Sequence, residues 1–174
     1  NTPQASRSIL DFMRNYDWSP RLIGSSLQMF RNIVKNGKDD QEISDRLYEN
    51  GMLQEIIRYC QKFERTESVC EEACSLIACL CTKEDGRHVE IIEAGSCGII
   101  FKSLELFGRD NEELVKNALE ALKLMSTNLE CFNQVKEKMH LVTDAIEAHQ
   151  TSEMVQIIGV AVVSSLDYFQ SSWR

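Results

Sequence analysis

The seven cysteines are the residues of this 174-residue chain with the greatest capacity for chemistry. Four of them, Cys70, Cys74, Cys79 and Cys81, are close together, and His88 follows. Thiolates and imidazoles are the usual ligands of zinc, but zinc sites draw pairs of ligands from short loops, and no Cys-x-x-Cys pair occurs here. Because free cysteine within an apolar helix behaves as a small buried hydrophobic residue, we expect buried thiols and no metal site. Cys79 is the thiol for which we expect reactivity.

The three histidines do not suggest a catalytic arrangement. His88, His140 and His149 stand in polar or helix-boundary stretches, without the spacing to a Ser, Cys or carboxylate that is typical of a nucleophile and its base. The sequence also lacks glycine-rich phosphate-binding loops and the His-Glu-x-x-His zinc motif. We therefore expect a non-enzymatic protein without catalytic residues or cofactors.

The composition favours a helical protein of the cytoplasm. Its net charge of −8 repels nucleic acid and anionic membrane surfaces, and no apolar stretch reaches the roughly 18–20 residues of a membrane span. Both prolines precede Leu22, so the strongest helix breaker is absent after it, and no strand-like alternation occurs. An odd number of cysteines in apolar runs suits reduced, intracellular thiols. We expect an all-α chain with no nucleic-acid partner and no membrane span.

A repeat of 44 residues is the main signal in the sequence. Glu49, Glu93 and Glu137 recur at this interval. Apolar residues keep the same phase two positions before each Glu and four, eight and eleven positions after it: Leu47, Ile91, Val135, Leu53, Cys97, Leu141, Ile57, Phe101, Ala145, Cys60, Leu104 and Ala148. Offsets of four, eight and eleven trace one face of a helix. Each copy therefore predicts a helical unit that needs a neighbour to cover its apolar face.

The segments between the repeated Glu residues predict longer helices and defined turns. Residues 69–81 and 114–125 place apolar side chains at helical spacing. Gly51 and Gly95 stand just after the repeated Glu, where glycine takes left-handed dihedrals without a Cβ penalty. The third copy has Met139 at this position, which predicts a turn of different shape.

This order of helices resembles the armadillo repeat. The similarity is best over residues 70–107, which contain Glu-Ala-Cys-Ser-Leu-Ile-Ala-Cys-Leu-Cys and then Glu-Ala-Gly-Ser-Cys-Gly-Ile. It implies one all-α domain, a right-handed alpha-alpha superhelix of armadillo type with about three and a half repeats. The expected boundaries within 1–174 are a capping helix in 1–20, repeats at 21–63, 66–107 and 110–150, and a partial repeat at 152–174.

The resemblance also implies a function. In armadillo proteins the third helices line a concave groove, where nuclear-import adaptors hold a peptide with pairs of Trp and Asn. None of the matched positions in this chain keeps that pair, so we do not expect import-signal binding. We expect instead a scaffold or adaptor that binds a segment of another protein in a partly apolar groove. The predicted contact residues are Met29, Ile33, Ser75, Cys79, Leu119, Lys123, Val160 and Ser164.

The last helix needs a cover, because residues 157–163 are apolar on all sides and a free end of a repeat array requires a polar face. Three covers fit: a further unit of a longer chain, which we favour, a second copy that forms a homodimer through Ile158 and Val162, or a folded-back tail. The tail side chains suited to this are Tyr168, Phe169 and Trp173.

Two other functions stay open at this point. One is a structural or oligomerisation segment of a larger intracellular protein, for example a ciliary or kinase-regulatory one, and the other is a cysteine-centred metal or redox site. Acidic pairs at Glu71–Glu72 and Glu112–Glu113 lie near predicted helix starts. Carboxylates are favourable at helix N-termini, which explains them; the alternative is an acidic rim that selects a basic partner.

Overall fold

The computed structural model describes residues 2–36, 51–82 and 88–172. Over these ranges the regular elements are helices, and no strand occurs among them. The helices are α1 (Thr2–Asn15), α2 (Pro20–Asn36), α4 (Met52–Lys62), α5 (Glu67–Cys81), α6 (His88–Glu93), α7 (Ser96–Phe107), α8 (Glu112–Met125), α9 (Leu129–Glu137), α10 (Met139–Ala148) and α11 (Glu153–Ser172). The prediction of an all-α chain is confirmed.

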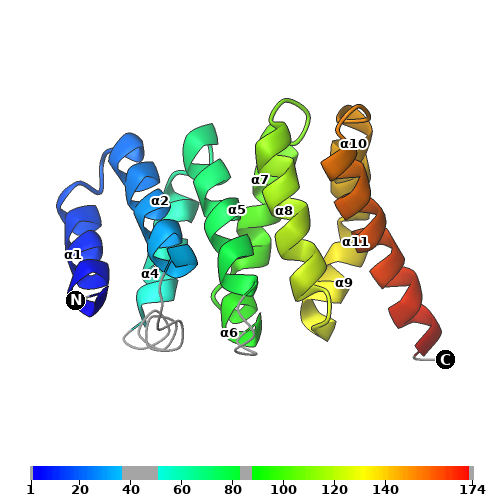
Figure 1. Cartoon of the computed structure of the whole chain (residues 1–174), viewed down its shortest axis with the longest axis horizontal. Helices are drawn as coiled ribbons and strands as arrows, with labels where there is room; N and C mark the ends of the chain where they lie inside the picture. Colours follow the sequence, from blue (N-terminus) through cyan, green and yellow to red (C-terminus); the bar gives the residue numbers. More distant parts are fainter. Residues whose placement is uncertain (1, 37–50, 83–87, 173–174) are drawn as a thin grey trace.

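The helices that contain the predicted contact residues form a single row (Figure 1). α2 packs against α5, α5 against α8, and α8 against α11, with α1 beside α2 at the N-terminal end. The shorter helices α4, α7 and α10 form a second set, in which α7 contacts both α4 and α10. The two ends of the chain lie at opposite ends of the row (Figure 1). Each long helix inside the row is therefore covered from both sides, whereas α11 is covered from one.

One continuous apolar core joins the two sets, and every described helix contributes buried side chains to it. The predicted helices at 69–81 and 114–125 are confirmed as α5 and α8, each of which starts two residues earlier than predicted. Because neighbours pack on both sides of these helices, α5 buries side chains on several of its faces. The apolar residues that recur at helical spacing in these segments are thus buried between neighbouring helices.

Side-chain caps fix where the long helices α8 and α11 begin. The Asn111 side-chain oxygen accepts a hydrogen bond from the backbone N–H of Leu114 (2.8 Å), and the Ser152 hydroxyl accepts one from the backbone N–H of Val155 (3.4 Å). Such caps satisfy backbone donors that have no partner inside the helix. The caps also allow α8 and α11 to be aligned residue by residue. In this alignment Leu119 and Val160 are equivalent, since each lies eight residues after its capping residue.

The turns follow the predicted glycine pattern. Gly51 and Gly95 have φ angles of 69° and 96°, so both adopt the left-handed conformation predicted for them. In the third copy a single residue, Lys138 with φ of −103°, separates α9 from α10, and Met139 is already helical. The predicted difference in this turn is confirmed. The first copy of the repeated Glu, Glu49, lies outside the described residues.

Hydrogen bonds between neighbouring long helices reproduce the interval of the sequence repeat. The Gln28 side chain donates to Glu72 (3.3 Å), and Arg31 donates to Ser75 (2.8 Å); both pairs are 44 residues apart. The Asn111 amide donates to Glu67 (2.9 Å), again 44 residues away. Since these bonds join α2 to α5 and α5 to α8, residues one sequence repeat apart lie side by side in the row.

Candidate interaction surface

All eight predicted contact residues lie on the row of long helices, two on each of α2, α5, α8 and α11. The sequence alignment of the four helices, from which these residues were predicted, therefore agrees with the order in which the helices pack along the row. The eight side chains do not share one environment, however. Their exposure divides them into a group at the two ends of the row and a group in the middle.

The N-terminal part of this surface exposes one large apolar side chain. Met29 on α2 is 56% exposed, and Ile33 is half-buried against the core. Ser75 on α5 is buried and accepts a hydrogen bond from Arg31, whose guanidinium also lies 3.4 Å from the Glu72 carboxylate. Cys79 is half-buried. Met29 is therefore the main apolar contact that this part of the row offers to a partner.

In the middle of the row the predicted apolar contact residue is buried. Leu119 on α8 is fully buried, with 0% exposure, because α5 and α11 pack on the two sides of α8; its predicted role as a contact residue is wrong. Lys123 is paired with Glu120 on the same helix (2.7 Å), and Lys116 is paired with Glu113 one turn after the helix start. The exposed face of α8 consequently carries charges that are already matched.

The outer face of α11 is apolar and exposed. Met154 is 54% exposed, Ile157 57% and the predicted contact residue Val160 64%, while Ser164 farther along the same face is also exposed. We call these four residues the outer stripe of α11. Residues 154–166 include no charged side chain. The spacing of the stripe is helical, so the sequence contained the signal for Met154 and Ile157, which the prediction missed.

The other face of α11 is buried in the chain. Ile158 is 6% exposed and Val162 0%, because this side of the helix packs against α8 and α10. The prediction that these two residues form a self-association surface is therefore wrong. Of the tail residues considered as a cover, Trp173 lies outside the described residues, as do the side chains of Tyr168 and Phe169.

A shallow groove of about 250 Å³ runs beside the outer stripe, between α10 and α11. Ile146 on α10 and Val160, Val163 and Ser164 on α11 line it. Gly159 lies at its floor, where a Cβ atom would meet the Cδ1 atom of Ile146 at 2.6 Å. The missing side chain lets the two helices approach closely. Thr143 and Glu147 on α10 complete the lining of the groove, which is otherwise mostly apolar.

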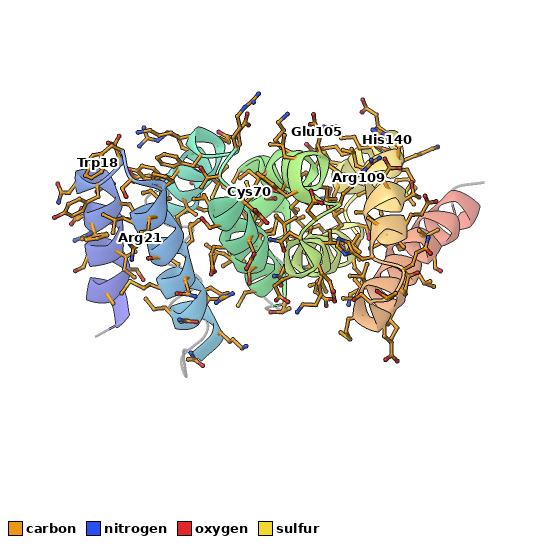
Figure 2. All side chains as sticks on the ribbon, turned by 90° about the horizontal axis from the view of Figure 1, so that it is seen from above. Trp18, Arg21, Cys70, Glu105, Arg109 and His140 are labelled. Carbon is orange, nitrogen blue, oxygen red and sulfur yellow. The ribbon has the colours of Figure 1, made fainter. Side chains whose placement is uncertain are left out.

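Six of the seven cysteines fall into two groups of neighbours in the core. Cys60, Cys70 and Cys74 are near one another, whereas Cys81 is near Cys131, which hydrogen-bonds to Cys97. Burial raises the pKa of Cys74 to about 12 and also raises the pKa of Cys60 and Cys70. The hydrogen bond with Cys131 lowers the pKa of Cys97. Figure 2 shows Cys70 in the interior of the array.

Two of the histidines and both acidic pairs have structural partners. His88 and His149 each hydrogen-bond through Nε2 to a backbone carbonyl, of Cys81 (2.9 Å) and Gly108 (3.1 Å) respectively, and His140 is exposed at the edge of the molecule (Figure 2). The capping side chains Asn111 and Ser152 donate to Glu71 and Glu112. Within the described ranges, no group of three or more His, Cys, Asp or Glu side chains is placed to hold a metal ion.

Comparison of the chain with protein-family models, with curated proteins and with solved structures gave no match. Among the helices of the described segments, none is long and apolar enough to cross a membrane.

Proposed function

We propose that the chain is a right-handed armadillo-type solenoid of about three and a half repeats and acts as a non-catalytic scaffold or adaptor that binds another protein. Neighbouring long helices joined by hydrogen bonds at the 44-residue interval support the repeat architecture. The seven cysteines, none of them in a disulfide, support a location in the reducing cytoplasm.

The exposed outer stripe of α11 is the observation that carries the binding role. Large apolar side chains that are more than half exposed, on a helix face without charges, mark interaction sites in soluble proteins when they are contiguous. Met154, Ile157 and Val160 meet this description, and the groove beside α10 offers room for an inserted side chain. An apolar helical segment of a partner suits this surface.

Selection of binders from a displayed library of helical peptides tests the proposal. We expect the selected peptides to be amphipathic and to lose binding to a variant with Ile157→Glu and Val160→Glu. The matched control is Val89→Glu with Leu129→Glu, which places the same charges on exposed apolar positions of α6 and α9. Peptides that bind the first variant as well as the parent would contradict the proposed surface.

The second candidate function is a structural or oligomerisation segment of a larger intracellular protein, and the same outer stripe favours it. A cysteine-centred metal or redox site has less support, because the thiols lie in two separate groups and burial raises the pKa of three of them.

A further inference from the structure

We propose that a pocket on the second set of helices binds a short extended peptide with a free ammonium group at one end and a free carboxylate at the other. The pocket has a volume of about 380 Å³, and its lining comes from α4, α5, α7, α10 and the turns beside them. Small-ligand sites in proteins commonly have volumes of this size. The pocket is separate from the outer stripe of α11, so its ligand is a second one beside the proposed helical partner.

Gly98 leaves the space that the pocket occupies. It lies on the exposed side of α7, and a Cβ atom placed there would meet no atom of another described helix within 4 Å. Phe101 and Ser103 lie on opposite flanks of α7, because successive residues of an α-helix are rotated by about 100°. Both of them line the pocket, which therefore crosses α7 from the side of α4 to the side of α10.

The Ser103 hydroxyl is a buried polar group that lacks a partner. The residue is 1% exposed, and within the described segments its Oγ atom has no hydrogen-bond partner of normal geometry. Its neighbours are thiols, since Ser103 opposes the rise in the pKa of Cys70 and Cys74. Sulfur is a weak acceptor, and an unpaired buried hydroxyl costs free energy. Because Ser103 lines the pocket, a peptide group of the ligand supplies the missing hydrogen bond.

Two opposite charges stand on the two flanks of α7. The Lys138 ammonium group lies 5.2 Å from the centre of the Phe101 ring, on the side of α10. The Glu64 carboxylate lies on the side of α4, close enough to Cys70 to contribute to the raised pKa of that thiol. Among the residues that the structure describes, neither Lys138 nor Glu64 has an ion-pair partner. Each is therefore available to a charged group of a ligand.

The balance of charges in the lining favours a zwitterionic ligand. The other charged residues of the lining, Lys102 and Glu105, pair with one another (3.0 Å), and Figure 2 shows Glu105 at the edge of the molecule. A simple anion is repelled by the net charge of −8, and a simple cation leaves Lys138 unmatched. A ligand with one ammonium group and one carboxylate matches both free charges and has no net charge of its own.

The width of α7 sets the length of the ligand. An α-helix with its side chains is about 10–12 Å across, so charges on its two flanks are on the order of 10 Å apart. An extended chain spans about 3.3–3.6 Å per residue, so about three residues reach from one flank to the other. Such a peptide passes over Gly98, with its amino end toward Glu64 and its carboxyl end toward Lys138.

Titration of the isotopically labelled chain with the tripeptide Ala-Leu-Ala, followed by NMR, tests the proposal. The amide resonances around Gly98 should shift at millimolar peptide. Acetylation of the amino end or amidation of the carboxyl end should each weaken binding about two- to fivefold, the effect of one half-exposed ion pair. An absence of shifts around Gly98, or equal binding of the doubly capped peptide, overturns the proposal.

Two substitutions test the pocket itself. Gly98→Leu fills the space above α7 and should abolish the shifts without loss of stability, because leucine favours a helix more than glycine does. The matched control Ser25→Leu adds the same side chain to an exposed position of α2 and should bind the peptide like the parent. Ser103→Ala should weaken binding while the melting temperature stays unchanged or rises, since no internal hydrogen bond is lost. Binding by Gly98→Leu equal to that of the control, or a marked loss of stability in Ser103→Ala, overturns the proposal.

The direction of the peptide is tested by combining the capped peptides with charge-removing variants. In Lys138→Met, amidation of the carboxyl end should have no further effect, whereas acetylation of the amino end should still weaken binding. Glu64→Gln should show the converse, because a variant that lacks one partner of a pair no longer responds to loss of the other. Full sensitivity to both caps in both variants overturns the assigned charge contacts, and exchanged sensitivities overturn the direction.

Discussion

α8 and α11 occupy successive places in the same row, yet their exposed faces differ. α8 presents Glu113, Lys116, Glu120 and Lys123, which pair along the helix. At the equivalent positions counted from the caps, α11 presents Met154, Ile157, Ala161 and Ser164. Charged side chains that pair with one another on the same helix need no partner. An uncharged apolar face, in contrast, is unfavourable in contact with water, and its burial against a partner lowers the free energy. The comparison favours the end of the row as the place of the proposed binding surface.

The inner and outer faces of α11 should respond most differently to charge. We expect Val162→Glu to lower the free energy of unfolding by about 4 kcal/mol or more, because the carboxylate would be buried without a partner. Ile157→Glu, on the outer stripe, should cost less than about 1 kcal/mol. Urea unfolding followed by circular dichroism measures both. Similar losses for the two variants would show that the outer stripe is packed inside the chain.

The equivalent residues Leu119 and Val160 should respond differently to truncation. Leu119→Ala removes a fully buried side chain, so we expect a loss of about 2–5 kcal/mol in the free energy of unfolding. Val160→Ala removes a mostly exposed side chain and should change stability by less than about 0.5 kcal/mol. The same unfolding experiment decides. A small loss of stability in Leu119→Ala would contradict the complete burial of this side chain in the middle of the row.

The charged pattern on the exposed face of α8 can be introduced on α11 by substitution. Met154→Glu with Ile157→Lys installs the equivalent of the Glu113–Lys116 pair, and an i, i+3 pair stabilises a helix by about 0.2–0.5 kcal/mol. We expect unchanged or slightly raised stability together with loss of binding of the selected helical peptides, measured by urea unfolding and by a peptide-binding assay. Retained peptide binding with the transferred pair would place the binding surface elsewhere.

The smallest expected effect is on the pH dependence of stability and involves Glu72 on α5. Burial raises the pKa of its carboxyl group, which the Arg31 charge partly opposes. The folded state therefore binds the proton more tightly than the unfolded state, and stability is lost as the pH rises through the raised pKa. Glu72→Gln removes this loss, so the variant should gain stability relative to the parent as the pH rises above about 4, near the ordinary pKa of a glutamate. A parallel pH profile for both proteins would contradict it.

Several features of the fold could be predicted from the residues. The apolar spacing of 69–81 and 114–125 gave α5 and α8, since a helix with neighbours must bury that face. Gly51 and Gly95 gave left-handed turns, since few other residues adopt positive φ without strain. The contact residues were predicted less well. A register carried from helix to helix assumes that each helix has the same neighbours, and α11 has none beyond it in the chain described here.

The sequence by itself determined that the chain is helical, which segments repeat at 44 residues and where the glycine turns fall, because these depend on spacing and on local backbone preference. Only the tertiary structure decided which face of each helix remains exposed. Leu119 and Val160 are both apolar residues at the same distance from a helix cap, and nothing local separates them. Leu119 is buried because a helix follows α8 in the row, and Val160 is exposed because α11 is covered from one side alone.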